Sequence, residues 1–192
     1  MKPYSCWLLA VLATQAACTT ESAAQAIAEP SVSAAKSRSE LVDGPSFRLN
    51  GQPHQPTTTA ELVRQLGQPD SIARGVVECG GELKTATSSA GDFWYYRDAQ
   101  YEVSGQQAII SRFDVTTGRF RAQAGRLQIN QHTTVYHVRR LFPVAVREAE
   151  ASGRPVEAIS LHWGYKGQQV EGLLNLEFAA GRLVRVELWY PC

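Results

Sequence analysis

The chain carries the stretch TTAELVRQL at residues 58–66 and the related stretch TTVYHVRRL at residues 133–141. Thr, Thr, Val, Arg and Leu recur in the same order, and a proline follows each copy, Pro69 or Pro143. A short strand-like piece that ends in Asn precedes each copy, at residues 47–50 and 127–130. Internal self-similarity indicates a repeated structural unit. The sequence therefore predicts two tandem units with the order strand, loop, helix.

Each predicted helix has a physical beginning and end. Thr58 and Glu61 have the spacing of a capping box, and Gly67 followed by Pro69 ends the first helix. In the second copy the helical region continues past Pro143 as far as Gly153. Apolar residues at helical spacing predict the buried stripes, which are Leu62, Val63 and Leu66 in the first copy and Val135, Val138, Leu141 and Phe142 in the second.

Segments rich in β-branched and aromatic residues follow each helix and predict strands. They are residues 92–97, 100–104 and 108–115 in the first copy, and residues 157–165, 172–178 and 183–190 in the second. In the last strand, residues 184, 186, 188 and 190 alternate with the others, and residues 179–182 predict a hairpin turn. The fold class is therefore α+β, with two tandem repeats at residues 45–118 and 119–192, each a short helix packed on an antiparallel sheet of three or four strands.

The pattern from Thr58 to Asp70, with Trp94-Tyr95-Tyr96 opening the strands, resembles the envelope lipoproteins of outer-membrane assembly (SmpA/OmlA). The doubled pattern is similar to the β-lactamase-inhibitor-protein-like fold. Residues 47–70 resemble more closely a bacterial domain family of unknown function that opens with Asn-Gly and ends its helix with Leu-Gly-x-Pro. These resemblances imply a fold and an envelope location. Copy two lacks the glycine after Leu141, and no inhibitor contact residue matches, so β-lactamase inhibition is not implied.

The N-terminus predicts export. Residues 6–17 form an apolar run that ends in small residues and is too short to span a bilayer, which makes residues 1–17 a signal peptide. Gln15-Ala16-Ala17 before Cys18 resembles a lipobox, so we expect lipidation at Cys18 and a flexible tether through residue 44. Cleavage after Ala24-Gln25-Ala26 is the alternative, and it would remove Cys18 and release a soluble protein.

Cysteine parity agrees with export. Cys6 leaves with the leader and Cys18 is acylated or removed, so Cys79 and Cys192 remain as a pair. An oxidising compartment favours a disulfide between them, and two independent thiols are the alternative.

Composition excludes several classes. The 192 residues are 44% hydrophobic and 19% charged, which is enough for a buried core. The chain has 19 Lys and Arg against 18 Asp and Glu, and loss of Lys2 with the leader makes the charge neutral. A nucleic-acid or anionic-membrane binder needs a basic excess, so we expect no nucleic acid and membrane contact through the lipid anchor only.

Catalytic motifs are lacking in the sequence. His132 and His137 have no Cys or His at zinc-ligand spacing, and the chain has no phosphate-binding loop and no hydrolase elbow. We therefore predict no enzyme activity, no catalytic or metal-binding residue and no cofactor. Scattered carboxylates leave open a hydrolase or small-ligand binder with a cleft between the repeats.

Aromatic residues on the predicted strands are the candidate functional residues. Trp and Tyr dominate the energetic centres of protein interfaces. We predict that one sheet face presents Trp94, Tyr96, Trp163 and Trp189 to an unknown envelope protein. Burial of both faces is the alternative for these residues. The predicted protein is thus a membrane-anchored lipoprotein of the periplasm or cell exterior, with a soluble periplasmic hydrolase inhibitor as a further alternative.

Overall fold

The computed structural model describes residues 40–77, 81–83, 90–151, 153 and 155–191. These residues all belong to one compact unit, Val32–Cys192. The predicted signal peptide, Cys18, most of the predicted tether, Cys79 and Cys192 lie outside the described residues.

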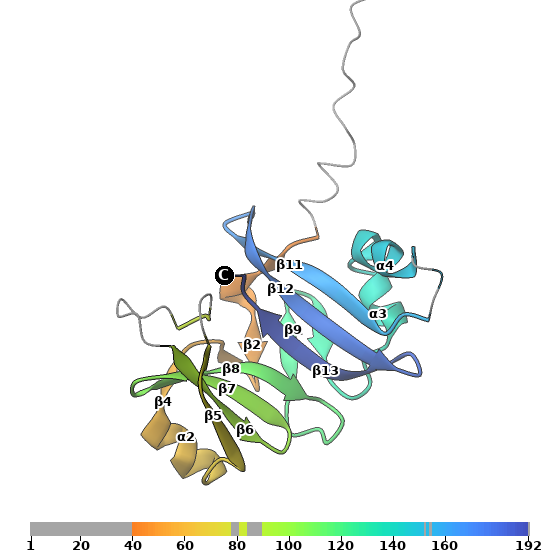
Figure 1. The fold of residues 1–192 in the computed structure, drawn as a ribbon. Helices are drawn as coiled ribbons and strands as arrows, with labels where there is room; N and C mark the ends of the chain where they lie inside the picture. Colours follow the sequence, from red (N-terminus) through yellow and green to blue (C-terminus); the bar gives the residue numbers. More distant parts are fainter. Residues whose placement is uncertain (1–39, 78–80, 84–89, 152, 154, 192) are drawn as a thin grey trace, which may run out of the picture. The chain divides into compact units, whose positions relative to one another are not determined.

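Two sheets organise the described residues (Figure 1). The larger has nine strands there, in the order β1–β11–β12–β13–β8–β7–β6–β5, and β4 pairs with β8 beside this path. β1 runs parallel to β11, and the other pairings in this sheet are antiparallel. The bounds are β1 (Val42–Asp43), β4 (Thr57–Thr58), β5 (Ser71–Val77), β6 (Gly91–Tyr96), β7 (Ala99–Ser104), β8 (Gln107–Asp114), β11 (Ala158–Tyr165), β12 (Gln168–Ala179) and β13 (Arg182–Trp189).

The smaller sheet has the order β10–β9–β2–β3 and is antiparallel throughout. It consists of two hairpins, one from β2 (Arg48–Leu49) and β3 (Gln52–Pro53), the other from β9 (Ala122–Ala124) and β10 (Leu127–Ile129). Each hairpin leads toward a helix, α2 (Thr59–Leu66) or α3 (Val135–Arg139), and α4 (Pro143–Glu150) follows α3. A short 3-10 turn, η1 (Gly44–Ser46), precedes β2.

The core lies between the larger sheet and these other elements. Phe113 of β8 packs on Phe120, with ring centroids 5.7 Å apart, and Phe47 meets Trp163 of β11 edge to face at 5.4 Å. Leu62 of α2 and Val146 of α4 are buried in the same cluster. The helices and the smaller sheet thus cover one face of the larger sheet, which we call the inner face.

The predicted α+β class is confirmed, and strands from both predicted halves lie in one sheet. The halves meet where β13 pairs with β8, through Val186 opposite Phe113 and its two neighbouring pairs. Both residues are fully buried. This join produces one large sheet, and it answers a question that the sequence left open, namely whether the two repeats share a sheet.

The first helix begins and ends where the sequence predicted. The Thr58 hydroxyl accepts the backbone N–H of Glu61 at 3.1 Å, and Gly67 follows the helix with a φ of 84°. Glu61 does not complete the capping box, because its carboxylate binds Arg64 and Gln65 of its own helix. In the second copy Thr134, one position after the residue that matches Thr58, is the N-cap.

The alternation predicted for the last strand was wrong at its beginning. Leu183 is buried while Val184 is partly exposed. Glu177 pairs with Arg185 but Phe178 pairs with Leu183, so Val184 is an extra residue and this bulge turns Leu183 inward. The predicted hairpin is confirmed, with positive φ at Ala180 and Gly181, as a tight turn of this kind requires.

The sequence did not predict the short elements β1, η1, β3, β4 and β9, nor the longer strand β5. Arg74 and Gly75 interrupt the apolar pattern of β5. The second helical region is two helices, since Phe142 has an extended φ of −132° before Pro143.

Candidate functional site

The face of the larger sheet opposite the core, the outer face, has no helix packed on it among the described elements. Strand register places one residue from each of seven strands in a single line across this face. We call this line the central row, and it consists of Ser160, Asn175, Glu187, Arg112, Gln100, Tyr95 and Ser71. Most of its members are exposed or partly exposed, whereas their chain neighbours on β11, β12 and β13 are buried. Antiparallel sheets commonly bury one face and leave the other to solvent or a partner.

Polar contacts order the outer face across the strands. Arg185 Nε lies 2.7 Å from Asp114 Oδ1, and its Nη1 lies 3.4 Å from Glu177 Oε2. The hydrogen bond to Asp114 raises the pKa of Arg185 above its ordinary value. Within the central row the Ser160 hydroxyl donates to the Asn175 side chain at 2.8 Å. These cross-strand contacts hold side chains of four strands in place.

Of the four predicted aromatic anchors, only Trp189 lies at the surface, with 45% exposure. Trp163 is buried against Phe47, and its indole N–H has no hydrogen-bond partner among the described residues. Trp94 is half-buried against the core. Tyr96 packs on Tyr101 and donates its hydroxyl to the carbonyl of Gly67 at 3.3 Å, and burial raises its pKa. Three of the four therefore face or line the core.

The aromatic side chains of β6 that reach the outer face are the alternate ones, Phe93 and Tyr95. Their ring centroids are 6.4 Å apart. Sequence alternation separates Tyr95 from Trp94 and Tyr96, but it does not tell which set faces the helices. Arg112 and Asn175 were also missed, because nothing in the sequence distinguishes a polar residue of an ordered row from any other exposed residue.

A polar cluster lies beside β7. The two oxygens of the Glu102 carboxylate accept the backbone N–H groups of Glu82 and Leu83 at 2.8 and 3.0 Å. His54 Nε2 lies 2.7 Å from Glu82 Oε2, and Tyr190 is hydrogen-bonded to the same carboxylate. Burial raises the pKa of Glu102 and of Tyr190. The cluster joins four segments that are distant from one another in the chain.

This cluster bears on the predicted cysteine pair. Glu82 is three residues after Cys79, and Tyr190 is two residues before Cys192. Both cysteines lie outside the described residues, so their pairing stays a prediction.

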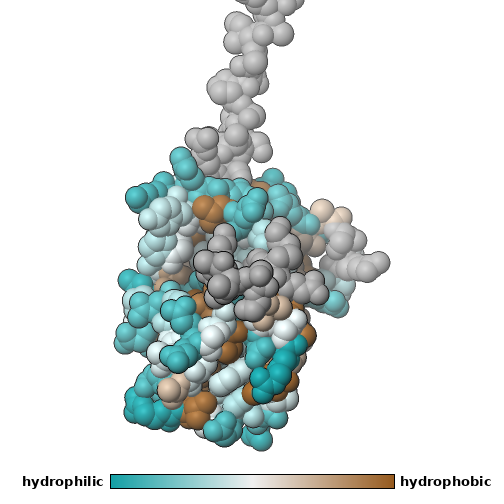
Figure 2. Space-filling model, turned by 60° about the vertical axis from the view of Figure 1, so that its left-hand side comes forward, coloured by the Kyte–Doolittle hydropathy of each residue, from teal (hydrophilic) through white to brown (hydrophobic). Residues whose placement is uncertain are grey.

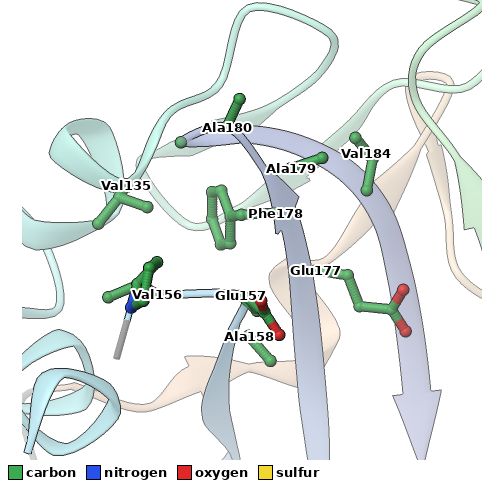
Figure 3. A pocket seen from close by; sticks show the side chains of 11 residues that line it. Val135, Val156, Glu157, Ala158, Glu177, Phe178, Ala179, Ala180 and Val184 are labelled. Atoms are coloured by element: carbon green, nitrogen blue, oxygen red, sulfur yellow. The ribbon is translucent and has the colours of Figure 1, made fainter. Parts of the chain in front are cut away.

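Among the grooves that the described residues form, two have the volume of a small-ligand site. The first, of about 820 Å³, lies beside the β12–β13 hairpin, with Phe178 between Val135 and Val184 and the carboxylates of Glu157 and Glu177 below (Figure 3). The second, of about 390 Å³, lies between α2 and the β2–β3 hairpin. Carboxamides and one guanidinium line it, and no carboxylate does: its polar lining includes Asn50, Gln52, Gln55, Gln65 and Arg119.

Hydrophobic residues do not form one large patch on the surface that Figure 2 displays; they lie as small areas among hydrophilic ones. Within the described ranges, no three His, Cys, Asp or Glu side chains are arranged to hold a metal ion. None of the helices there combines the length and the apolar character that crossing a membrane requires.

Comparison of the chain with models of protein families, with curated proteins and with solved structures finds no match in any of the three. The resemblances drawn from the sequence therefore stay expectations.

Proposed function

We propose that this protein is an exported lipoprotein, anchored at Cys18, whose folded part binds another protein through the outer face of its larger sheet. One observation carries the binding role: a single row of side chains runs across seven strands on a face that no described helix covers. The leader and tether support the location. The function is binding and not catalysis.

The composition of the outer face suits a protein partner. Tyr95 and Arg112 belong to the residue types that contribute most at interfaces, and Phe93 adds apolar area beside them. The ion pairs of Arg185 with Asp114 and Glu177 fix neighbouring side chains before binding. Such pre-ordering lowers the conformational entropy that association costs.

We infer that the two halves descend from one duplicated unit. The sheet orders support this: β2 of the first hairpin pairs with β9 of the second, and β8, the last strand of the first half, pairs with β13, the last strand of the second. Both joins are antiparallel, as a two-fold arrangement of related units requires. The halves differ, since four strands follow α2 and three follow α4.

Site-specific photo-crosslinking in the bacterium that produces the protein tests the binding role. The crosslinker replaces Tyr95, Ser160 or Asn175 on the outer face, and Gln65 of α2 or Glu148 of α4 serves as the matched exposed control. We expect one adduct of constant mass from the outer-face positions and none from the controls. Equal adducts from the controls, or no adduct from any position, would refute the proposal.

Combined with fatty-acid labelling, the crosslinking distinguishes the anchored protein from a soluble periplasmic inhibitor. Labelling with a radioactive fatty acid that requires Cys18 identifies the lipoprotein, and Cys18→Ser is the control. A crosslinked partner without the label would support the soluble inhibitor.

The groove between α2 and the β2–β3 hairpin favours a second candidate, an exported binder of small ligands. Its amides and Arg119 offer hydrogen bonds to a ligand that carries no positive charge. Burial raises the pKa of Tyr101 in its floor to about 12, so the hydroxyl stays a donor at physiological pH. A rise in the unfolding temperature with D-glucuronate or D-glucose, absent with glucosamine and lost in Gln65→Ala, would support this function.

A further inference from the structure

Three of the large apolar side chains that are most exposed in the described chain lie at one end of the larger sheet. Tyr165 and Val170 belong to the β11–β12 hairpin, with 51% and 41% exposure, and Trp189 ends β13 with 45%. The backbone of Gly172 adjoins that of Trp189, since a Cβ on Gly172 would meet the Trp189 carbonyl at 3.3 Å. We call Tyr165, Lys166, Val170 and Trp189 the aromatic tip.

The first described residues lie at this same end. Val42 and Asp43 pair with Trp163 and Gly164, directly before Tyr165. Leu41 lies against Gly164, because a Cβ on that glycine would come within 2.9 Å of the Leu41 Cβ. Figure 1 shows the first described residues beside the β11–β12 hairpin.

The first described residue is fastened to a helix. The Glu40 carboxylate accepts the backbone N–H groups of Val144 and Ala145 at 3.0 and 3.2 Å, at the first turn of α4. Glu40 is therefore held at a defined point, and Leu41, the next residue, lies beside the tip.

The chemistry of the tip suits the interfacial region of a bilayer. Trp and Tyr prefer the level of the lipid headgroups, where the ring is apolar on one side and polar on the other. Lys166 holds its ammonium 5.3 Å from the centre of the Tyr165 ring, and a lysine at this level extends its charge toward water. Asp43 and Glu171 lie nearby in sequence and strand order, so the tip has no basic excess for anionic lipids.

We propose that the aromatic tip contacts the zwitterionic headgroup region of the membrane that holds Cys18. The inference rests on the proposed anchor. Cys18 and Glu40 are 22 positions apart (40 − 18 = 22), and the tether that the sequence predicts would span roughly 25 Å over that length. The anchor thus confines the tip to the membrane surface, where the high effective concentration lets a weak contact form.

This orientation leaves the binding face accessible. Ser160 of the central row is five residues before Tyr165 on β11, which is roughly 16 Å along a strand. Asn175 is likewise five residues after Val170 on β12, whereas Glu187 is two residues before Trp189 on β13, which is roughly 7 Å. Ser160 and Asn175 therefore stay outside the headgroups when the β11–β12 hairpin touches them, and Glu187 lies nearest to the contact. Trp189, predicted from sequence as a partner-binding residue, is assigned here to lipid contact.

Tryptophan quenching in vesicles tests the inference. The purified mature lipoprotein is reconstituted in phosphatidylcholine vesicles with and without brominated acyl chains. We expect bromine to quench part of the emission in the wild type and not in Trp189→Phe. Tyr165→Ser with Val170→Ser reduces the quenching at least twofold, and Tyr136→Ser, which changes another exposed tyrosine on α3, leaves it unchanged.

The lipid contact and the anchor can fail separately, and each failure gives a different experimental result. Mass spectrometry of the same preparation shows whether Cys18 carries lipid. If lipidated protein shows equal emission in both kinds of vesicle, the lipid contact is overturned and the anchor stands. Quenching that occurs only when phosphatidylglycerol is added has the same meaning. Cys18 without lipid would overturn the anchor and this inference with it, while the crosslinking result for the outer face would still decide the binding role.

Discussion

The carboxylate of Glu102 accepts the backbone N–H of Leu83 at 3.0 Å, so a residue of β7 holds a segment 19 positions earlier in the chain against the sheet. Leu83 and Ile109 are both buried at this place and lie outside the main core cluster. Glu102, which is itself buried, thus fixes Glu82 and Leu83 beside β7.

Glu102 predicts a pH dependence of stability. Burial raises its pKa in the folded state above the ordinary 4.5. The folded protein therefore binds this proton more tightly than the unfolded chain, and stability falls as pH rises from 4.5 through the folded pKa. Glu102→Gln has no such proton. We expect the stability of Glu102→Gln relative to wild type to increase from pH 4 to pH 7 in urea unfolding, and a constant difference would contradict this.

Glu82, three residues after Cys79, is hydrogen-bonded to Tyr190, two residues before Cys192. This contact draws the two segments together, so we predict that Cys79 and Cys192 form a disulfide. A bridge that closes so long a loop stabilises by about 3–5 kcal/mol. Cys79→Ser and Cys192→Ser should lose the same amount, and the double variant no more than either. Alkylation of both thiols in the unreduced native protein would exclude the bridge.

Thr58 predicts a local loss of stability. Its hydroxyl accepts the Glu61 N–H at the first turn of α2. Thr58→Ala removes this bond and should cost about 1 kcal/mol in the free energy of unfolding. Thr59→Ala, one position inside the helix, is the matched control and should change it by less than about 0.5 kcal/mol. Equal losses of stability in Thr58→Ala and Thr59→Ala would contradict a stabilising role for the cap.

The join between β8 and β13 predicts cooperative unfolding of both halves. Phe113 and Val186 are fully buried opposite each other. Phe113→Ala should cost about 3–5 kcal/mol. Because the halves share this core, fluorescence and circular dichroism should report one transition with the same midpoint in wild type and variant. Two separated transitions would show that the halves unfold independently.

The candidate site was only partly accessible from sequence. Alternation on β6 separated Trp94 from Tyr95, but the facing of a strand depends on which side the helices cover, and that is a tertiary fact. Trp163 illustrates the same limit. A tryptophan suits an interface as well as it suits a core, and its contact with Phe47 shows that Trp163 belongs to the core. The central row needs register across seven strands, which no local pattern encodes.

The sequence alone determined the α+β class, the place of α2 with its Thr58 cap and Gly67 end, and the strands at β6, β7, β8, β11, β12 and β13, because these depend on local periodicity and on capping chemistry. Only the tertiary structure decided that β8 and β13 join the halves into one sheet and that Val184 is a bulge. It also decided which aromatic residues reach the surface. Long-range strand pairing and burial depend on contacts between residues far apart in the chain, and a local pattern carries no record of them.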